Sequence, residues 1–265
     1  MSPAASVKID LQETFPWLER APIVEAVIEL RARAQIDWDE SAVREQLASR
    51  LSDYPAPHSQ HVFQQELKVE PGKSAQVAIH DVGWQGLRFE SGDKRHIVQF
   101  NRDGFVFSRL EPYKDWAQFR GEALRLWSVY SELAQPAEIQ RLGVRFINRI
   151  MPVEITKLAD FLTQTPRHPE NLPLPLSGYL HQDTFDVPGH PYAVKMIQTI
   201  QPQPTPASNE GFSLILDIDV FVTQPFEPVE NLIKERLMEM RWLKNKAFFG
   251  IIKKDAVKAF QGSST

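Results

Sequence analysis

Two stretches decide how this chain folds: IVEAVIELRAR at residues 23–33 and RLGVRFINRI at residues 141–150. In both, charged and apolar side chains alternate, and alternation with a period of two is typical of a β-strand with one polar and one buried face. Asn148 is the one polar residue on the apolar side of the second stretch. The matched strands predict an internally duplicated fold with a charged surface or channel that both copies line.

The elements that follow each of these strands come in a similar order. A helical stretch, several alternating stretches and a long amphipathic helix follow the first strand, and the dipeptide Asp103-Gly104 marks a hairpin turn among them. A similar series follows the second strand and ends in two helices over residues 227–243 and 248–260. We therefore expect an α+β fold in which β-α-β-β-β-α occurs twice, with one extra strand in the first copy.

Antiparallel strands followed by a long helix predict antiparallel sheets that are each packed on their own helix. Residues 1–21 then form an N-terminal leader, residues 22–133 the first repeat and residues 138–262 the second, fused into one compact body. Because the identity between the two halves is weak, an α+β chain without any duplication is the alternative interpretation.

Composition excludes several classes of function. The net charge of −4 gives no basic footprint for duplex nucleic acid. The chain has no cysteine, which excludes disulfides, thiolate nucleophiles, Fe–S clusters and Cys-ligated zinc. It shows neither a secretory signal nor the ~20 consecutive apolar residues of a membrane helix, so we expect a cytoplasmic protein without a membrane partner.

Residues 21–31, APIVEAVIELR, resemble the N-terminal signature of a sporadically distributed family of uncharacterised bacterial proteins. Four further segments fall where that family has its other recurring blocks, and together the five span nearly the whole chain. These segments are FSRLEPY at 107–113, RLGVRFINRI at 141–150, LDID at 216–219 and KNKAFF at 244–249. The resemblance implies an accessory bacterial cytosolic protein, and it carries over no catalytic residue.

The candidate ligand-binding residues form a charged cluster on the polar faces of the two matched strands. They are Glu25, Glu29, Arg31, Arg141, Arg145 and Arg149. If the strands pack side by side around a pseudo-twofold axis, the glutamates lie near the arginines. The cluster then forms either a ladder of cross-strand ion pairs, each worth ~0.2–1 kcal/mol, or a polar groove whose arginines hold a phosphate or carboxylate.

Asp217 and Asp219 are a candidate metal site, because residues two apart on a strand point to the same face. Two carboxylates in this arrangement can hold Mg²⁺ or Mn²⁺ together with water and substrate oxygens. Their neighbours on that face, Ile215 and Phe221, are apolar, which favours an N-cap, an ion pair or a solvated sheet face instead. No other cofactor is expected, since the histidines form no His-x-x-x-His pair and the chain has no phosphate-binding glycine loop.

The sequence leaves two hypotheses for the function. The first is a non-enzymatic accessory protein that binds a protein partner or a small anionic ligand, with the apolar surface of the C-terminal helices as a possible dimer interface. The second is a metal-dependent phosphohydrolase with a charged cleft or tunnel between the repeats. In that case Glu25, Glu29 and the two aspartates would hold the metal, and Arg145 and Arg149 the phosphate.

Overall fold

The fold was analysed on a computed structural model that describes residues 5–68, 76–153, 157–166, 169, 171–202 and 212–262. The tip of the 56–90 hairpin and the segment 203–211 lie outside these ranges.

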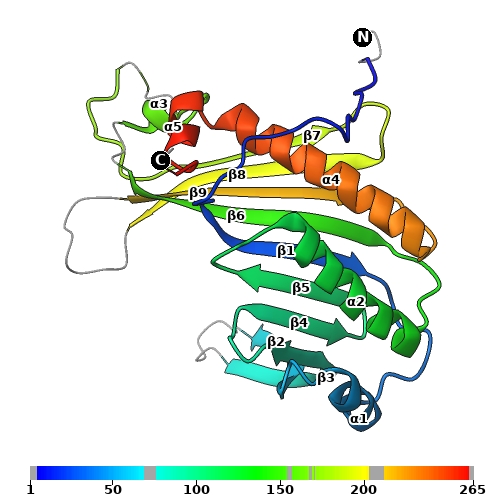
Figure 1. Ribbon diagram of the computed structural model, residues 1–265. Coiled ribbons are helices and arrows are strands. Elements are labelled where there is room, and N and C mark those ends of the chain that lie inside the picture. The colour runs from blue at the N-terminus through cyan, green and yellow to red at the C-terminus, as the bar shows by residue number, and fades with distance from the viewer. Residues whose placement is uncertain are drawn as a thin grey trace.

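A nine-stranded antiparallel sheet forms the body of the molecule (Figure 1). Its strands are β1 (Ile23–Arg31), β2 (Ala56–Lys68), β3 (Gln76–Glu90), β4 (His96–Asn101), β5 (Gly104–Leu110), β6 (Arg141–Val153), β7 (Leu180–Asp186), β8 (Tyr192–Pro202) and β9 (Phe212–Val222). Their spatial order is β2-β3-β4-β5-β1-β6-β9-β8-β7. The α+β class with antiparallel strands is confirmed, but the expectation of separate sheets is wrong, because β1 pairs with β6 and joins all strands into one sheet.

The pairing of β1 with β6 explains why the two matched stretches alternate as they do. Leu30 lies opposite Leu142, and Ile28 opposite Val144, and all four side chains are buried. The residues between them point to the other face, where Glu29 lies opposite Gly143. One face of this central pair therefore belongs to the core, and the other carries the charged residues.

Helices α2 (Trp116–Ala134) and α4 (Glu230–Ile251) cross the same face of the sheet (Figure 1). Asp115 caps the N-terminus of α2: its carboxylate accepts a hydrogen bond from the backbone N–H of Gln118 at 2.8 Å and so satisfies one free donor of the first turn. Three shorter helices complete the fold: α1 (Glu40–Arg50), α3 (Leu158–Phe161) and α5 (Lys254–Lys258).

The prediction of two separate C-terminal helices, over 227–243 and 248–260, is wrong. α4 runs without a break to Ile251, because residues 244–247 contain neither glycine nor proline and continue the helix. Only the five-residue α5 follows it. The apolar residues of α4, among them Ile233, Leu237 and Leu243, are buried within the chain itself.

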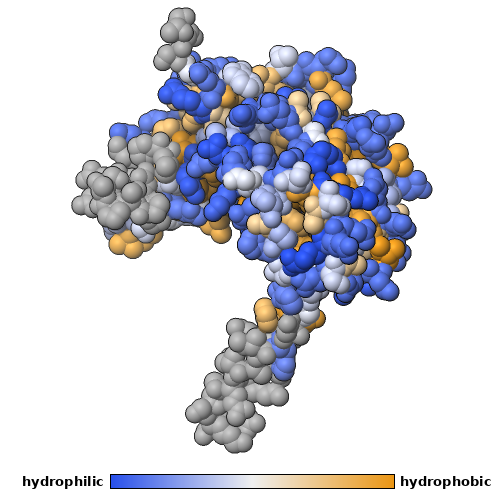
Figure 2. Space-filling model, turned by 60° about the horizontal axis from the view of Figure 1, so that its bottom comes forward, coloured by the Kyte–Doolittle hydropathy of each residue, from blue (hydrophilic) through white to orange (hydrophobic). Residues whose placement is uncertain are grey.

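Buried side chains from the sheet and helices form one continuous apolar core. The N-terminal segment, defined here as residues 5–22, packs against it from outside: Phe15 stacks on Phe249 of α4 at 5.6 Å between ring centroids. None of the helices in the described ranges is both long and apolar enough to cross a membrane. The face shown in Figure 2 is largely hydrophilic, with smaller hydrophobic areas between the polar ones.

Candidate functional site

Arg141 is the centre of the charged cluster on the face of the sheet away from α2 and α4. One nitrogen of its guanidinium donates to Glu29 on β1, and the other donates to Asp219 on β9 at 2.8 Å. Because only 16% of the Arg141 side chain is exposed, this ion pair across three strands is well shielded from water. Glu29 therefore lies next to an arginine of β6, Arg141, as the sequence predicted.

Gly143 makes room for this arrangement. A Cβ atom built on Gly143 would collide with the guanidinium of Arg141. The same guanidinium lies 5.1 Å from the ring centroid of Phe221, the residue opposite Gly143 on β9. A glycine inside a strand often marks such a close approach, and here it lets one arginine reach two carboxylates.

Arg145 does not bind a glutamate of β1, as the matched strands suggested, but an aspartate of β9. Its Nε and one terminal nitrogen donate to both oxygens of Asp217, at 2.8 and 2.5 Å, and this bidentate bond raises the pKa of Arg145. Asp217 and Asp219 are both only 8% exposed. Burial raises the pKa of Asp219, while the charges of Arg141 and Arg145 act in the opposite direction.

The remaining candidate residues lie at the margin of the charged cluster. Arg31 is exposed and donates to Glu29 at 3.0 Å. Arg149 is exposed and makes no ion pair with any other residue in the described part of the chain. Glu25 lies opposite Ile147, close enough to Arg145 for its charge to raise the pKa of that arginine. The six predicted residues thus share one face, but only Glu29, Arg31, Arg141 and Arg145 surround a common space.

That space is a depression of about 520 Å³ over β1, β6, β8 and β9, which we call the charged cavity. Lys195 of β8 and Asp219 complete its charged lining. Within the described ranges, no three or more acidic or histidine side chains are grouped so that they could hold a metal ion. The aspartates of the predicted metal site use their oxygens to accept hydrogen bonds from arginines.

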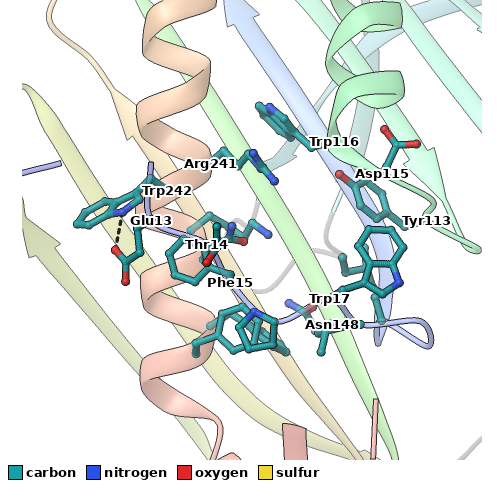
Figure 3. Close-up of a pocket in the computed structure, with 18 of the residues that line it drawn as sticks. Glu13, Thr14, Phe15, Trp17, Tyr113, Asp115, Trp116, Asn148, Arg241 and Trp242 are labelled. Atoms are coloured by element: carbon teal, nitrogen blue, oxygen red, sulfur yellow. Dashed lines mark hydrogen bonds between the residues drawn. The ribbon is translucent and has the colours of Figure 1, made fainter. Parts of the chain in front are cut away.

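A second cavity, of about 450 Å³, lies on the opposite face of the sheet, between the N-terminal segment, the start of α2 and the C-terminal half of α4. We call it the aromatic cavity, because aromatic side chains dominate its walls (Figure 3). Its aromatic residues are Phe15, Trp17, Tyr113, Trp116, Trp242, Phe248 and Phe249. None of the residues predicted to bind a ligand or metal lines it.

Two cations, Arg241 and Lys244, face the aromatic cavity from α4. They are three residues apart and therefore neighbours on one side of the helix. Arg241 is exposed and points from α4 toward Trp116 and Tyr113 (Figure 3). Lys244 is partly buried, and its Nζ lies 4.2 Å from the ring centroid of Phe146 on β6. Neither cation has an ion pair or a hydrogen bond to another residue that the structure describes.

Burial and, to a smaller extent, the positive charge of Arg241 lower the pKa of Lys244 to about 7. The aromatic surroundings explain this: Phe146 is 1% exposed, and the ring of Tyr113 packs edge-on against it at 5.5 Å between centroids. An ammonium group held in such a place loses hydration and gains only the weak attraction of an aromatic face.

The acidic residues around the aromatic cavity are already bonded elsewhere. Glu13 accepts from the indole N–H of Trp242 at 2.8 Å and from Lys246 at 2.9 Å, which anchors the N-terminal segment to α4. Asp115 caps α2. Asn148 lies on the floor with 2% exposure, and its amide nitrogen donates to the carbonyl of Leu216 at 3.0 Å. The charged residues that line the cavity are Glu13, Lys114, Asp115, Arg241 and Lys244, so its cations outnumber its carboxylates by three to two.

Two weak signals in the sequence point to the aromatic cavity. Asn148 interrupts an otherwise apolar strand face, and Lys244 is the first of three polar residues, 244–246, between the apolar residues 242–243 and 247–249. From the sequence alone, each is more simply interpreted as a polar residue that the fold tolerates. Only tertiary packing brings the two residues together with Tyr113 and Arg241.

No protein-family model matches this chain, and no curated protein matches it in sequence. The geometry of the two cavities is therefore the basis for assigning a function.

Proposed function

We propose that this chain is a binding protein for a small organic anion, and that the aromatic cavity is its binding site. A suitable ligand has one carboxylate or similar anionic group and an aromatic or branched apolar body. The expected setting is that of an accessory cytosolic protein, in line with the family resemblance of the sequence.

The observation that carries this proposal is the pair of cations without a counterion. Arg241 and Lys244 stand next to each other on α4 and repel one another, and no carboxylate among the described residues neutralises them. A ligand anion would relieve this repulsion and accept charge-assisted hydrogen bonds from both side chains. The bidentate donor geometry of Arg241 suits a carboxylate at the rim of the cavity.

The size and lining of the cavity support a ligand with an apolar body. Binding sites for small molecules commonly measure about 300–1,000 Å³ and combine apolar walls with a few polar groups. At about 450 Å³, the aromatic cavity falls within this range, and Trp116 and Phe248 are among the apolar residues of its walls. The polar floor at Asn148 provides a further contact.

Thermal unfolding with a matched pair of compounds tests the proposal. 3-Phenylpropionate carries the anion and the ring, and 3-phenylpropionamide has nearly the same shape without the charge. A ligand that binds the folded state raises the melting temperature by mass action. We expect the carboxylate to raise it and the amide at the same concentration to have little effect.

Variants test whether the rise in melting temperature comes from binding in the aromatic cavity. Arg241→Gln and Lys244→Met should each weaken the shift, whereas Lys234→Gln, a half-buried residue of the same helix that pairs with Glu230, should leave it unchanged. Equal shifts in all three variants would place the anion elsewhere on the molecule. The absence of any shift with 3-phenylpropionate and related carboxylates would refute the proposed function.

The charged cavity supports a phosphohydrolase less well. A metal ion would have to displace Arg145 from Asp217 and Arg141 from Asp219, and a phosphate would compete with carboxylates for the same arginines. We infer that this cluster stabilises the fold as a ladder of ion pairs. Hydrolysis of nucleoside triphosphates in the presence of Mg²⁺ or Mn²⁺, lost on Asp217→Asn, would show that the ladder hypothesis is wrong.

We further propose that the chain arose by internal duplication. β1 and β6 are central and antiparallel, and each is flanked on its other side by the last strand before a long helix, β5 before α2 and β9 before α4. This order supports a pseudo-twofold relation between residues 22–133 and 138–262. A superposition of the two halves that pairs these elements, over most of the shorter half, would test it.

A further inference from the structure

Lys244 differs from the other lysines of α4 in what surrounds its amine. Lys246 is exposed and Lys234 half-buried, and each pairs with a glutamate. Lys244 instead lines the aromatic cavity; its amine lies over the ring of Phe146 at 4.2 Å and has no acceptor among the described residues. An amine in this setting has only the face of the Phe146 ring to stabilise its ammonium form, and it belongs to the lining of the cavity.

We propose that Lys244 is a nucleophilic site whose Nζ condenses with the carbonyl group of a small 2-oxo acid bound in the aromatic cavity, forming an imine. This proposal rests on the proposed function and deepens it, because it names both the ligand class and the atom that reacts with it.

The arrangement of the two cations favours a 2-oxo acid over other carbonyl compounds. In such an acid the carboxylate is bonded directly to the carbonyl carbon. Arg241 and Lys244 are three positions apart on one side of α4, so their Cβ atoms are about 5–6 Å apart. Arg241 can hold the carboxylate near the rim while Lys244 meets the adjacent carbonyl, and the side chain of the acid then extends among the aromatic residues.

The chemistry balances without any other reactant. The lone pair of the neutral amine attacks the carbonyl carbon, and a proton moves from nitrogen to the carbonyl oxygen to give a carbinolamine. The hydroxyl group then leaves as water together with the remaining proton of the nitrogen, and the C=N bond forms. Only the neutral amine reacts, and the low pKa of Lys244 keeps about half of it neutral near pH 7, whereas an ordinary lysine is almost wholly protonated there.

Reductive trapping at pH 7 tests the proposal on the full-length protein. The protein is incubated with phenylpyruvate and cyanoborohydride, and the modified lysine is located by peptide mass spectrometry. We expect one adduct per chain, at Lys244, formed at least tenfold faster than at Lys234 or Lys246. 3-Phenylpropionate, which lacks the oxo group, should slow the labelling by competition.

Two variants serve as controls. Lys244→Arg keeps the positive charge and should abolish the adduct, with folding checked by circular dichroism. Lys246→Arg, two residues away, should label like the wild-type protein. Labelling spread evenly over several lysines, or an undiminished adduct in folded Lys244→Arg, would overturn the proposal.

The outcomes separate this inference from the proposed function. If 3-phenylpropionate raises the melting temperature but Lys244 is not labelled by phenylpyruvate, the cavity binds anions and the imine proposal fails alone. If 3-phenylpropionate neither binds nor competes, both proposals fail, even where Lys244 reacts, because that reaction would then need no bound anion.

Discussion

Lys244 shows how one side chain can act against the stability of the fold. Its pKa is lowered to about 7 in the folded chain, against about 10.4 for an unfolded lysine. Above pH 10.4 Lys244 is neutral in both the folded and the unfolded chain, so its ionisation does not lower the stability of the fold. As the pH falls toward 7 the unfolded chain takes up a proton that the folded chain does not, so the folded state loses stability, and the loss is complete below pH 7.

Lys244→Met should therefore raise the free energy of unfolding at pH 7, and the gain should shrink as the pH approaches 10. Methionine keeps the length of the side chain and can still pack on Phe146. Urea unfolding of both proteins at several pH values measures the difference. A difference that does not change between pH 7 and pH 10 would contradict a lowered pKa at Lys244.

Arg141 has the opposite role, because it neutralises two carboxylates on the other face of the sheet. Arg141→Met leaves Glu29 and the buried Asp219 without their shared partner, and loss of one member of a buried pair costs about 3–5 kcal/mol. We expect a loss near the lower end of that range, because Glu29 is partly exposed.

Two further variants test whether the lost stability comes from the unpaired carboxylates. Adding Asp219→Asn to Arg141→Met should recover part of the lost stability, since the unpaired charge disappears. Arg31→Met removes an exposed partner of the same Glu29 and should change stability by less than about 1 kcal/mol. Equal losses for the two arginine variants would show that burial of the Arg141 pair does not matter.

The hairpin of β4 and β5 depends on the geometry of its turn. Gly104 has a φ of +154°, and a Cβ atom there would collide with the backbone of Leu30 on β1. Gly104→Ala should thus destabilise the protein by about 1–3 kcal/mol through backbone strain and crowding of the neighbouring strand.

Gly121 offers a matched control in α2. A Cβ atom there meets no other atom within 4 Å, and alanine suits a helix better than glycine, so Gly121→Ala should stabilise by about 0.5–1 kcal/mol. Thermal or urea unfolding of both variants provides the comparison. A neutral Gly104→Ala would mean that this turn adapts without strain.

The continuous sheet predicts that the molecule unfolds as one unit. β1 belongs to the N-terminal half of the chain and pairs with both β5 and β6, and the apolar core extends across both halves without a gap. Amides of β4 and β8, on either side of the centre, should therefore exchange with the same free energy of opening. A clearly lower value on one side would reveal a half that opens independently.

Local alternation was sufficient to predict parts of the fold. Ala26, Ile28 and Leu30 are buried, and Glu29 and Arg31 lie on the other face, as a period of two requires. The turn at Asp103-Gly104 also lies where the dipeptide predicts it. These features depend on a few neighbouring residues, so they can be recognised without knowing the rest of the molecule.

The partners of these residues depend on the tertiary structure. The alternation of β6 places Arg145 on the charged face, but the pairing with β9 brings two aspartates within its reach. Asp219 lies directly opposite, and Arg145 extends diagonally to Asp217 and not to a glutamate of β1. The space over Gly143 likewise decides that Arg141 reaches two carboxylates. Register and strand order are long-range properties, and a single sequence specifies them only through the energy of the complete fold.

Sequence alone thus indicated an antiparallel α+β protein without cysteine whose charged residues share one face of the central strands. Folding decided that all strands form one sheet, that the predicted charges on that face are largely paired, and that Arg241 and Lys244 face an aromatic cavity on the other. The reason is physical: alternation and helix propensity are local, whereas a cavity exists only where distant segments pack and leave space between them.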